Sequence, residues 1–337
     1  MNAASLPPRY AAMALVDAAQ HRLQPIECTH APLRSGEQRL RVRACGVCRT
    51  DLHIVDGDLA TPALPRVPGH EIVGSVVELG PDCRRFRVGD RVGVPWLHGT
   101  CTHCGYCRSG RENLCESAVF TGWTVDGGYA EYAVAHEDYS FVIPAGYSDE
   151  QAAPLLCAGL IGYRALGMLP GASAVGLYGF GAAGHLIAQV ALAQGRHVFA
   201  FTRPGDAAAQ ALARSLGVGW AGDSTQAPPQ PLDGAILFAP TGTLVPAALQ
   251  QIVPGGTVVC AGIHMSDIPS FPYRWLWKER CVRSVANLTR RDGREFFAFA
   301  ATHPLSLSTT SYALADANTA LADLRSGRIT GAAVLRC

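Results

Sequence analysis

A six-residue glycine motif in the middle of the chain narrows the possible folds more than any other segment. Residues 179–184 are G-F-G-A-A-G, which is the pattern G-x-G-x-x-G. An apolar run at 175–178 precedes the motif, and residues 182–193 have the apolar spacing of one helix face. A strand, a glycine turn and a helix in succession are the context in which this motif binds the pyrophosphate of a dinucleotide. The predicted dinucleotide site consists of Gly179, Gly181, Ala182, Ala183 and Gly184.

The segments after the motif alternate between predicted strands and predicted helices. We expect strands at 197–201, 235–239 and 257–261, the last of them after the turn at 254–256. A helix is expected at 206–216, with Asp206 as a plausible N-cap. Alternation of this kind indicates a parallel sheet with helices on both faces, a doubly wound Rossmann domain. We assign it to residues 158–287.

The first 150 residues have the pattern of a β-rich domain. Short apolar runs such as 12–16, 39–42 and 72–77 are interrupted repeatedly by Gly, Pro or Asp. The C-terminal residues return to mixed structure and are expected to fold back on this domain. The chain is therefore predicted to be an α/β protein with a β-rich domain at 1–157 and 288–337.

Composition and charge exclude several classes of protein. Hydrophobic residues make up 48% of the chain, which argues against intrinsic disorder. The net charge of +1 lacks the basic surplus of a nucleic-acid binder. Residues 1–20 show no signal-peptide pattern, and no apolar run approaches a membrane span. We therefore expect a soluble, cytoplasmic protein with no nucleic-acid or membrane partner, whose 12 cysteines serve metal binding or catalysis rather than disulfides.

Four cysteines are spaced C-x2-C-x2-C-x7-C, which favours a zinc site. Zinc takes four thiolates in a tetrahedron, and such a site is structural because it leaves no open coordination position. An iron–sulfur cluster or four free thiols are the alternatives. The predicted ligands are Cys101, Cys104, Cys107 and Cys115.

A second set of metal-binding residue types, Cys48, His70 and Cys157, is dispersed along the chain. Spacing alone does not define a site here. A cysteine can be a small buried apolar group, and a histidine can be satisfied within a core. Both interpretations stay open on the residues themselves.

Five motifs together resemble the zinc-containing, medium-chain alcohol dehydrogenases. They are G-V-C-R-T-D-L-H at 46–53, G-H-E at 69–71, the four-cysteine segment at 101–115, A-P-L-L-C-A-G at 153–159 and the glycine motif. Their order and spacing match that family over nearly the full length. The resemblance implies a GroES-like β-rich catalytic domain beside the Rossmann domain, and two zinc ions per chain. It also implies that Cys48, His70 and Cys157 hold the catalytic zinc, with Asp51 and Glu71 orienting the ligands and Glu71 as an alternate ligand.

The activity that the resemblance implies is reversible hydride transfer between a small primary or secondary alcohol and a nicotinamide cofactor. Zinc acts as Lewis acid on the alcohol oxygen. Thr50 takes the proton and relays it, through the cofactor ribose, to His53. Arg49 is expected on the cofactor pyrophosphate, and Trp96, with Trp123, is expected to line the substrate pocket.

The cofactor choice depends on the end of the second Rossmann strand. NAD enzymes usually have an acidic residue there, but this chain has Thr202 followed by Arg203. A missing carboxylate beside an arginine favours NADP(H) over NAD(H). The alternative is that Arg203 stacks on the adenine or points to solvent.

Two rival functions remain. One is zinc-independent reduction of an enone or quinone by NADPH on the same scaffold, because a fold does not fix a function. The other is a non-catalytic zinc-binding module. For the main hypothesis the partners are a small alcohol or aldehyde and further copies of the chain, as a homodimer or homotetramer, with 281–287 as an edge strand.

Overall fold

The computed structural model describes residues 6–59 and 63–337. Residues 1–5 and 60–62, which belong to the predicted β-rich domain, lie outside the described residues. Backbone contacts divide the chain into two units. Unit 1 comprises Met1–Cys157, Thr289–Ala301 and Ser308–Cys337, and unit 2 comprises Ala158–Leu288 and Thr302–Leu307. The short return of residues 302–307 to unit 2 is a detail that the predicted domain boundaries lack.

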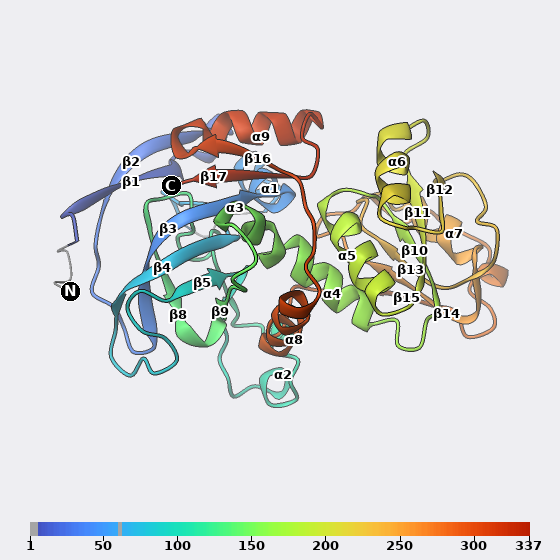
Figure 1. Ribbon diagram of the computed structural model, residues 1–337, viewed down its shortest axis with the longest axis horizontal. Helices are drawn as coiled ribbons and strands as arrows, with labels where there is room; N and C mark the ends of the chain where they lie inside the picture. Colours follow the sequence, from blue (N-terminus) through green and yellow to red (C-terminus); the bar gives the residue numbers. More distant parts are fainter. Residues whose placement is uncertain (1–5, 60–62) are drawn as a thin grey trace. The chain divides into compact units, whose positions relative to one another are not determined.

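Unit 1 is built on a seven-stranded sheet with the order β16-β17-β3-β4-β5-β9, in which β8 also pairs with β3. Strands β16 and β17 are parallel, and the remaining pairs are antiparallel. Along β3, exposed Arg41 and Arg43 alternate with buried Leu40, Val42 and Ala44, the period of a strand with one covered face. Helix α9 packs on β16 and β17 (Figure 1).

The strands of unit 1 are β1 (Arg9–Leu15), β2 (Leu23–Thr29), β3 (Glu37–Val47), β4 (Ile72–Leu79), β5 (Arg91–Val94), β6 (Leu97–Gly99), β7 (Val119–Phe120), β8 (Tyr132–His136), β9 (Phe141–Val142), β16 (Thr309–Ala313) and β17 (Ala332–Arg336). Its α-helices are α1 (Arg49–Asp56), α2 (Gly105–Arg108), α3 (Asp149–Ala152), α8 (Arg290–Thr302, whose last residue belongs to unit 2) and α9 (Ala317–Ser326). Its 3-10 turns are η1 (Ala18–Gln20), η2 (Glu112–Leu114), η3 (Glu137–Tyr139), η4 (Ala153–Leu156) and η6 (Leu314–Asp316).

Unit 2 is a six-stranded parallel sheet with the order β12-β11-β10-β13-β14-β15, the doubly wound arrangement expected of a Rossmann domain. Right-handed crossovers place α5 and α6 on one side of the sheet and α7 on the other (Figure 1). The sheet is apolar because helices cover both faces, and every residue of β10 is buried. Within the core, the rings of Tyr178 and Phe201 stack with centroids 4.0 Å apart.

The strands of unit 2 are β10 (Ala174–Tyr178), β11 (His197–Thr202), β12 (Trp220–Asp223), β13 (Leu232–Leu237), β14 (Ile252–Cys260) and β15 (Cys281–Ser284). Its helices are α4 (Ala158–Gly167), α5 (Ala182–Ala193), α6 (Ala207–Ser215), α7 (Leu244–Leu249) and the 3-10 turn η5 (Tyr273–Trp275).

Most predicted Rossmann elements are confirmed, and the main error concerns β14. The sequence predicts a turn at 254–256 and a strand only after it, whereas β14 already begins at Ile252. The turn residues lie inside the strand as an irregularity: Gly255 has a φ of +77°, and the register with β13 shifts between Leu232 and Gly234. Strand β15 stops at Ser284, before the predicted end at 287, where Asn287 adopts a left-handed backbone.

Among the described residues, no helix combines the length and the apolar character that crossing a membrane would require.

Candidate functional site

The junction between β3 and α1 places Cys48 at the start of a helix. Its sulfur accepts a hydrogen bond from the Thr50 N–H at 3.3 Å, as an N-cap residue does. The Asp51 carboxylate returns to the Cys48 N–H at 2.9 Å and completes a capping box. Asp51 also accepts from the Gly69 N–H at 3.2 Å and lies 3.3 Å from Nδ1 of His70. A fully buried carboxylate therefore connects the helix start to the segment that contains His70.

The dispersed residues Cys48, His70, Glu71 and Cys157 come together in unit 1. Each offers one ligand atom, and these four atoms all lie within 4.8 Å of one another. Cys48 Sγ and His70 Nε2 lie 3.1 Å apart. His70 and Glu71 directly precede β4, and Cys157 follows the turn η4. The sequence positions alone could not show this proximity, because it depends on how three separate segments pack.

Gly46 leaves room for the Glu71 carboxylate in this cluster. A Cβ atom at Gly46 would lie 1.8 Å from Glu71 Oε2, so no other residue fits there without moving the carboxylate. The Gly46 N–H also donates to the Glu71 carbonyl at 3.0 Å. Both the main chain and the side chain of Glu71 are thus held against β3.

Burial and mutual charge shift the ionisation of the cluster. The hydrogen bond from Cys157 and the neighbouring His70 lower the pKa of Cys48 well below its usual value. The same contact with Cys48, together with burial, raises the pKa of Cys157. Burial, reinforced by the charge of Cys48, raises the pKa of Glu71. Several anionic donors in one closed space repel one another, and a bound cation would relieve that repulsion.

The donor set of this cluster fits zinc. Ligand atoms at about 2.0–2.3 Å from one tetrahedral ion lie about 3.3–3.8 Å apart. The four atoms of this cluster, all within 4.8 Å of one another, are compatible with that spacing. Two thiols and one imidazole are soft and borderline donors that zinc prefers. Three such ligands leave the fourth position for substrate or for Glu71.

The four cysteines of the second group also fit one zinc ion. Their sulfurs lie within 4.8 Å of one another, with Cys101 and Cys107 at 3.9 Å and Cys104 and Cys107 at 3.5 Å. These separations match the edges of a tetrahedron of thiolates. The remaining member, Cys115, is buried, and its sulfur accepts from the Cys101 N–H at 3.5 Å. All 12 cysteines of the chain are free.

A buried carboxylate fixes this four-cysteine segment to α8. Glu112, 5% exposed, accepts from the N–H of Arg290 at 3.0 Å and from its Nε at 3.3 Å. The guanidinium of Arg290 lies over the ring of Tyr139, 5.1 Å from its centroid. Sequence reasoning did not identify this contact, because 178 residues separate its two partners.

The three residues predicted to bind cofactor or move protons in α1 occupy different environments. Thr50 is buried, two residues after Cys48. His53 is in the last turn of α1, where its Nδ1 lies 2.8 Å from Oδ2 of Asp58. Arg49 is exposed and has no ion-pair partner among residues 6–59 and 63–337.

Aromatic rings form a wall beside His70. The rings of Trp96 and His70 are nearly perpendicular, with centroids 4.9 Å apart. Trp96 stacks on Trp123 at 5.9 Å and on Phe120 at 5.2 Å. The structure therefore brings both predicted tryptophans together, and it adds Phe120, which the sequence analysis missed because one phenylalanine in a short strand carries no signal.

The glycine motif of unit 2 occupies the turn between β10 and α5. Gly179 has a φ of +96°, and a Cβ there would lie 2.8 Å from the Ala239 nitrogen. A Cβ on Gly184 would lie 2.3 Å from the Gly179 carbonyl oxygen. Gly181 is the N-cap of α5 and faces open space, so the helix N-terminus starting at Ala182 and Ala183 is accessible to an anion.

The end of β11 differs from a ribose-binding strand end. Thr202 is 2% exposed, and its hydroxyl donates to the backbone carbonyls of Arg203 and Gly222 inside the domain. Arg203 is 86% exposed, 3.8 Å from Asp206, which caps α6. Asp223, absent from the sequence predictions, pairs in register with Thr202 and accepts from the Gly205 N–H at 3.1 Å.

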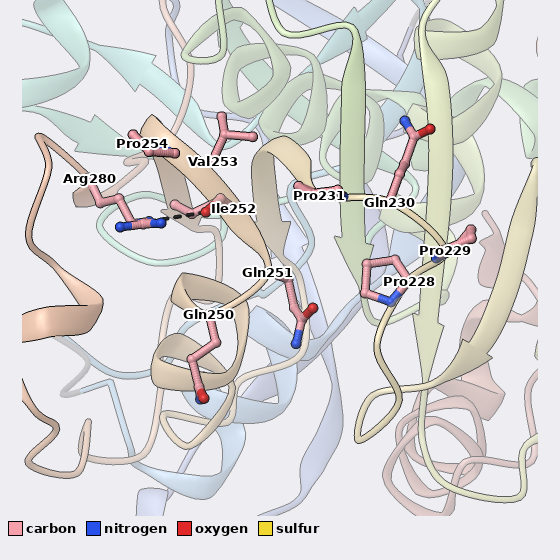
Figure 2. Close-up of a pocket in the computed structure, with 10 residues that line it drawn as sticks. All are labelled: Pro228, Pro229, Gln230, Pro231, Gln250, Gln251, Ile252, Val253, Pro254 and Arg280. Carbon is pink, nitrogen blue, oxygen red and sulfur yellow. Dashed lines mark hydrogen bonds between the residues drawn. The ribbon is translucent and has the colours of Figure 1, made fainter.

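A separate groove of about 380 Å³ in unit 2 offers none of this chemistry. Residues 228–231, 250–254 and Arg280 line it (Figure 2). Arg280 donates to the Ile252 carbonyl at 3.0 Å, so its charge is engaged with the groove wall. None of these ten described lining residues is a cysteine, a histidine or a carboxylate.

Comparison with known proteins gives concordant similarities. Residues 34–145 match the family model described as alcohol dehydrogenase GroES-like domain. The chain is 50% identical over 307 residues to the probable alcohol dehydrogenase AdhA of Mycobacterium tuberculosis, covering 89% of this chain and 88% of that protein.

Two solved structures are similar over almost the whole chain. One is acetophenone reductase from Geotrichum candidum in complex with NAD, with a TM-score of 0.88, 26% identity and 99% of each chain covered. The other is a cobalt- and zinc-bound thermostable alcohol dehydrogenase from Pyrobaculum aerophilum, with a TM-score of 0.87, 26% identity, and 98% of this chain and 100% of that one covered.

Proposed function

The chain belongs to the zinc-containing medium-chain alcohol dehydrogenase family, and from this premise we propose that the cluster of Cys48, His70, Glu71 and Cys157 is its catalytic metal site. The protein is an alcohol dehydrogenase that exchanges a hydride between an alcohol and a nicotinamide cofactor. The observation that carries the site assignment is the convergence of four ligand atoms within 4.8 Å.

Cys48, His70 and Cys157 hold the catalytic zinc, and Asp51 orients His70 through its Nδ1. When bound, the metal supplies a Lewis acid that lowers the pKa of the alcohol. Two thiolates balance its two positive charges. Glu71, held against Gly46, is the alternate ligand at this site. A second zinc at Cys101, Cys104, Cys107 and Cys115 has a structural role, which makes two per chain.

Proton movement is assigned to two residues of α1. Buried Thr50 accepts the proton of the substrate hydroxyl, and His53, whose side chain is 17% exposed, releases it to solvent. Exposed Arg49 binds the pyrophosphate of the cofactor. The GroES-like unit thus supplies both the metal ligands and the acid–base groups.

For the cofactor we favour NADP(H) over NAD(H). Thr202 offers no carboxylate to a ribose 2′-hydroxyl, and its own hydroxyl is hydrogen-bonded to backbone carbonyls of the domain. Arg203 is exposed and can pair with a 2′-phosphate. The Asp223 carboxylate is the counter-argument, but it already accepts hydrogen bonds from Gly205 and from Gln210.

The substrate is a small or slender apolar alcohol, or the corresponding aldehyde or ketone. Trp96, Trp123 and Phe120 form one aromatic wall next to His70 and restrict the width of what can approach it. We assign a homodimeric or homotetrameric assembly through β15, which ends the sheet of unit 2. Tyr273 and Trp277, which precede it, are 68% and 56% exposed. The set of free cysteines supports a cytoplasmic location.

The test is the absorbance of reduced nicotinamide with a panel of alcohols, and with aldehydes in reverse, using NAD(H) and NADP(H) separately. Cys48→Ala removes one thiolate and is expected to abolish turnover and to lower the zinc content from two to one per chain. Cys260→Ala, a buried cysteine of unit 2 outside both metal clusters, is the control and should retain both zinc ions. Unchanged turnover in Cys48→Ala would refute the metal site and favour enone or quinone reduction.

A further inference from the structure

A carboxylate supports the candidate relay histidine. Nδ1 of His53 lies 2.8 Å from Oδ2 of Asp58, the distance of a charge-assisted hydrogen bond. The Asp58 side chain is 43% exposed, so the pair lies on the solvent side of the helix end. None of the motifs that identify the family contains Asp58.

The local fold turns the chain back so that this contact forms. Helix α1 ends at Asp56, and Gly57 follows in a left-handed conformation with a φ of +84°. The Gly57 N–H donates to the Ile54 carbonyl, and the Leu59 N–H donates to the His53 carbonyl at 3.1 Å. These two bonds reverse the chain, and Asp58 lies beside Nδ1 of His53.

We propose that Asp58 is a positioning residue that fixes the tautomer and the ring orientation of His53. An ionised carboxylate only accepts hydrogen bonds, so the neutral imidazole must carry its hydrogen on Nδ1. Its Nε2 then has the lone pair that takes up a proton. The proposal rests on the relay role that the preceding section gives to His53.

The neighbouring Asp56 provides a matched control. Its carboxylate pairs with Arg325 of α9. Replacing Asp56 therefore perturbs the same helix end and removes the same charge, while the His53–Asp58 contact stays.

The kinetic test compares Asp58→Ala, Asp58→Glu and Asp56→Ala in the oxidation of a primary alcohol. We expect Asp58→Ala to lower kcat by about five- to tenfold, as the loss of one partly exposed hydrogen bond of ordinary strength would. The cofactor KM should stay unchanged, Asp58→Glu should recover most of the rate, and Asp56→Ala should resemble the parent. In a His53→Ala background, Asp58→Ala should cause no further loss, because its effect passes through the ring.

A second measurement reports the tautomer directly and needs neither turnover nor bound metal. In a deuterated chain with ¹⁵N-labelled histidine, long-range ¹H–¹⁵N spectra should show His53 with its hydrogen on Nδ1. The His53→Ala variant assigns the signal. Asp58→Ala should shift the ring toward the Nε2–H form. This readout on the parent chain also decides the question if Asp58→Ala does not fold.

The outcomes separate the two proposals. A His53→Ala variant with full activity would refute the relay role itself. An impaired His53→Ala with an unimpaired Asp58→Ala, or equal losses from Asp58→Ala with and without His53, would refute only the positioning role. An Nε2–H tautomer in the parent chain would refute it as well.

Discussion

Gly46 and Glu71 are in such close contact that a Cβ atom on the glycine would lie 1.8 Å from the carboxylate oxygen Oε2. The carboxylate cannot retreat easily, because Glu71 is 2% exposed and its carbonyl accepts from the Gly46 N–H. The absence of a side chain at position 46 is therefore a condition for the four-residue cluster.

Gly46→Ala should displace Glu71 and disturb the adjacent His70, a proposed metal ligand. We expect the activity to fall about 10- to 100-fold, the range typical of lost support around a metal ligand. Zinc analysis should show less than two ions per chain. Gly146→Ala is the control, since nothing lies within 4 Å of a Cβ there. Equal activities of the two variants would contradict a role for Glu71 in this cluster.

Arg203→Ala tests the preference for NADP(H). Loss of a charged partner of the 2′-phosphate should raise the KM for NADP(H) by about tenfold or more and leave that for NAD(H) nearly unchanged. Arg274→Ala, another exposed arginine of unit 2, should change neither value. A parent enzyme that works only with NAD(H) would overturn the preference. It would make Asp223 the candidate carboxylate for the ribose 2′-hydroxyl.

Glu112→Gln tests how the four-cysteine segment is held. The variant removes the buried charge that accepts two hydrogen bonds from Arg290. We expect a loss of about 1–2 kcal/mol and a fall in Tm of about 2–6 °C, because Arg290 is partly exposed and also lies near Asp138. Glu116→Gln, on the exposed side of the same segment, should leave Tm unchanged in thermal denaturation. A similar fall in Tm in both variants would contradict a specific role for the Glu112–Arg290 contact, because loss of any negative charge in the segment would then have the same effect.

His98 should make the protein sensitive to mild acid. Burial, with a smaller contribution from His136, lowers the pKa of His98 to about 4, and its Nδ1 has no partner among the described residues. Unfolded histidine has a pKa of about 6.5, so between these values the unfolded state binds more protons. Stability should therefore decrease as the pH falls from about 6.5 to 4, by about 1–3 kcal/mol from this group.

The measurement is the difference in stability between the parent and His98→Phe as a function of pH, which cancels the titration of the metal ligands common to both. The difference should shift in favour of the variant as the pH decreases. A difference that does not change with pH would show that His98 does not titrate in this range.

The Rossmann unit could largely be predicted because its signals are local. The predicted helix 182–193 coincides with α5, since its apolar spacing and the preceding glycine turn define both ends. Asp206 caps α6 as predicted, because its side-chain oxygen accepts a hydrogen bond from the Ala209 N–H. The start of β14 was missed because Pro254, Gly255 and Gly256 form a turn in isolation, whereas the pairing with β13 keeps them within a strand.

The site could be predicted only through the resemblance to a family. No property of Cys48, His70 or Cys157 indicates that the three meet, because their approach depends on the packing of segments up to 109 positions apart. Other contacts that support the candidate site were not predicted from the sequence. The space at Gly46, the ring of Phe120 and the carboxylate of Asp58 act through proximity, which the sequence does not encode locally.

The sulfur of Cys48 has two roles: it caps the first turn of α1, and it is one of the four atoms of the candidate metal site. Serine is as good a helix cap, but its hydroxyl is a poor substitute for a thiolate on zinc. Alanine loses both functions. Replacing Cys48 by either residue therefore weakens the proposed metal site or the helix start, so the helix that contains Thr50 and His53 and the proposed metal site depend on the same side chain.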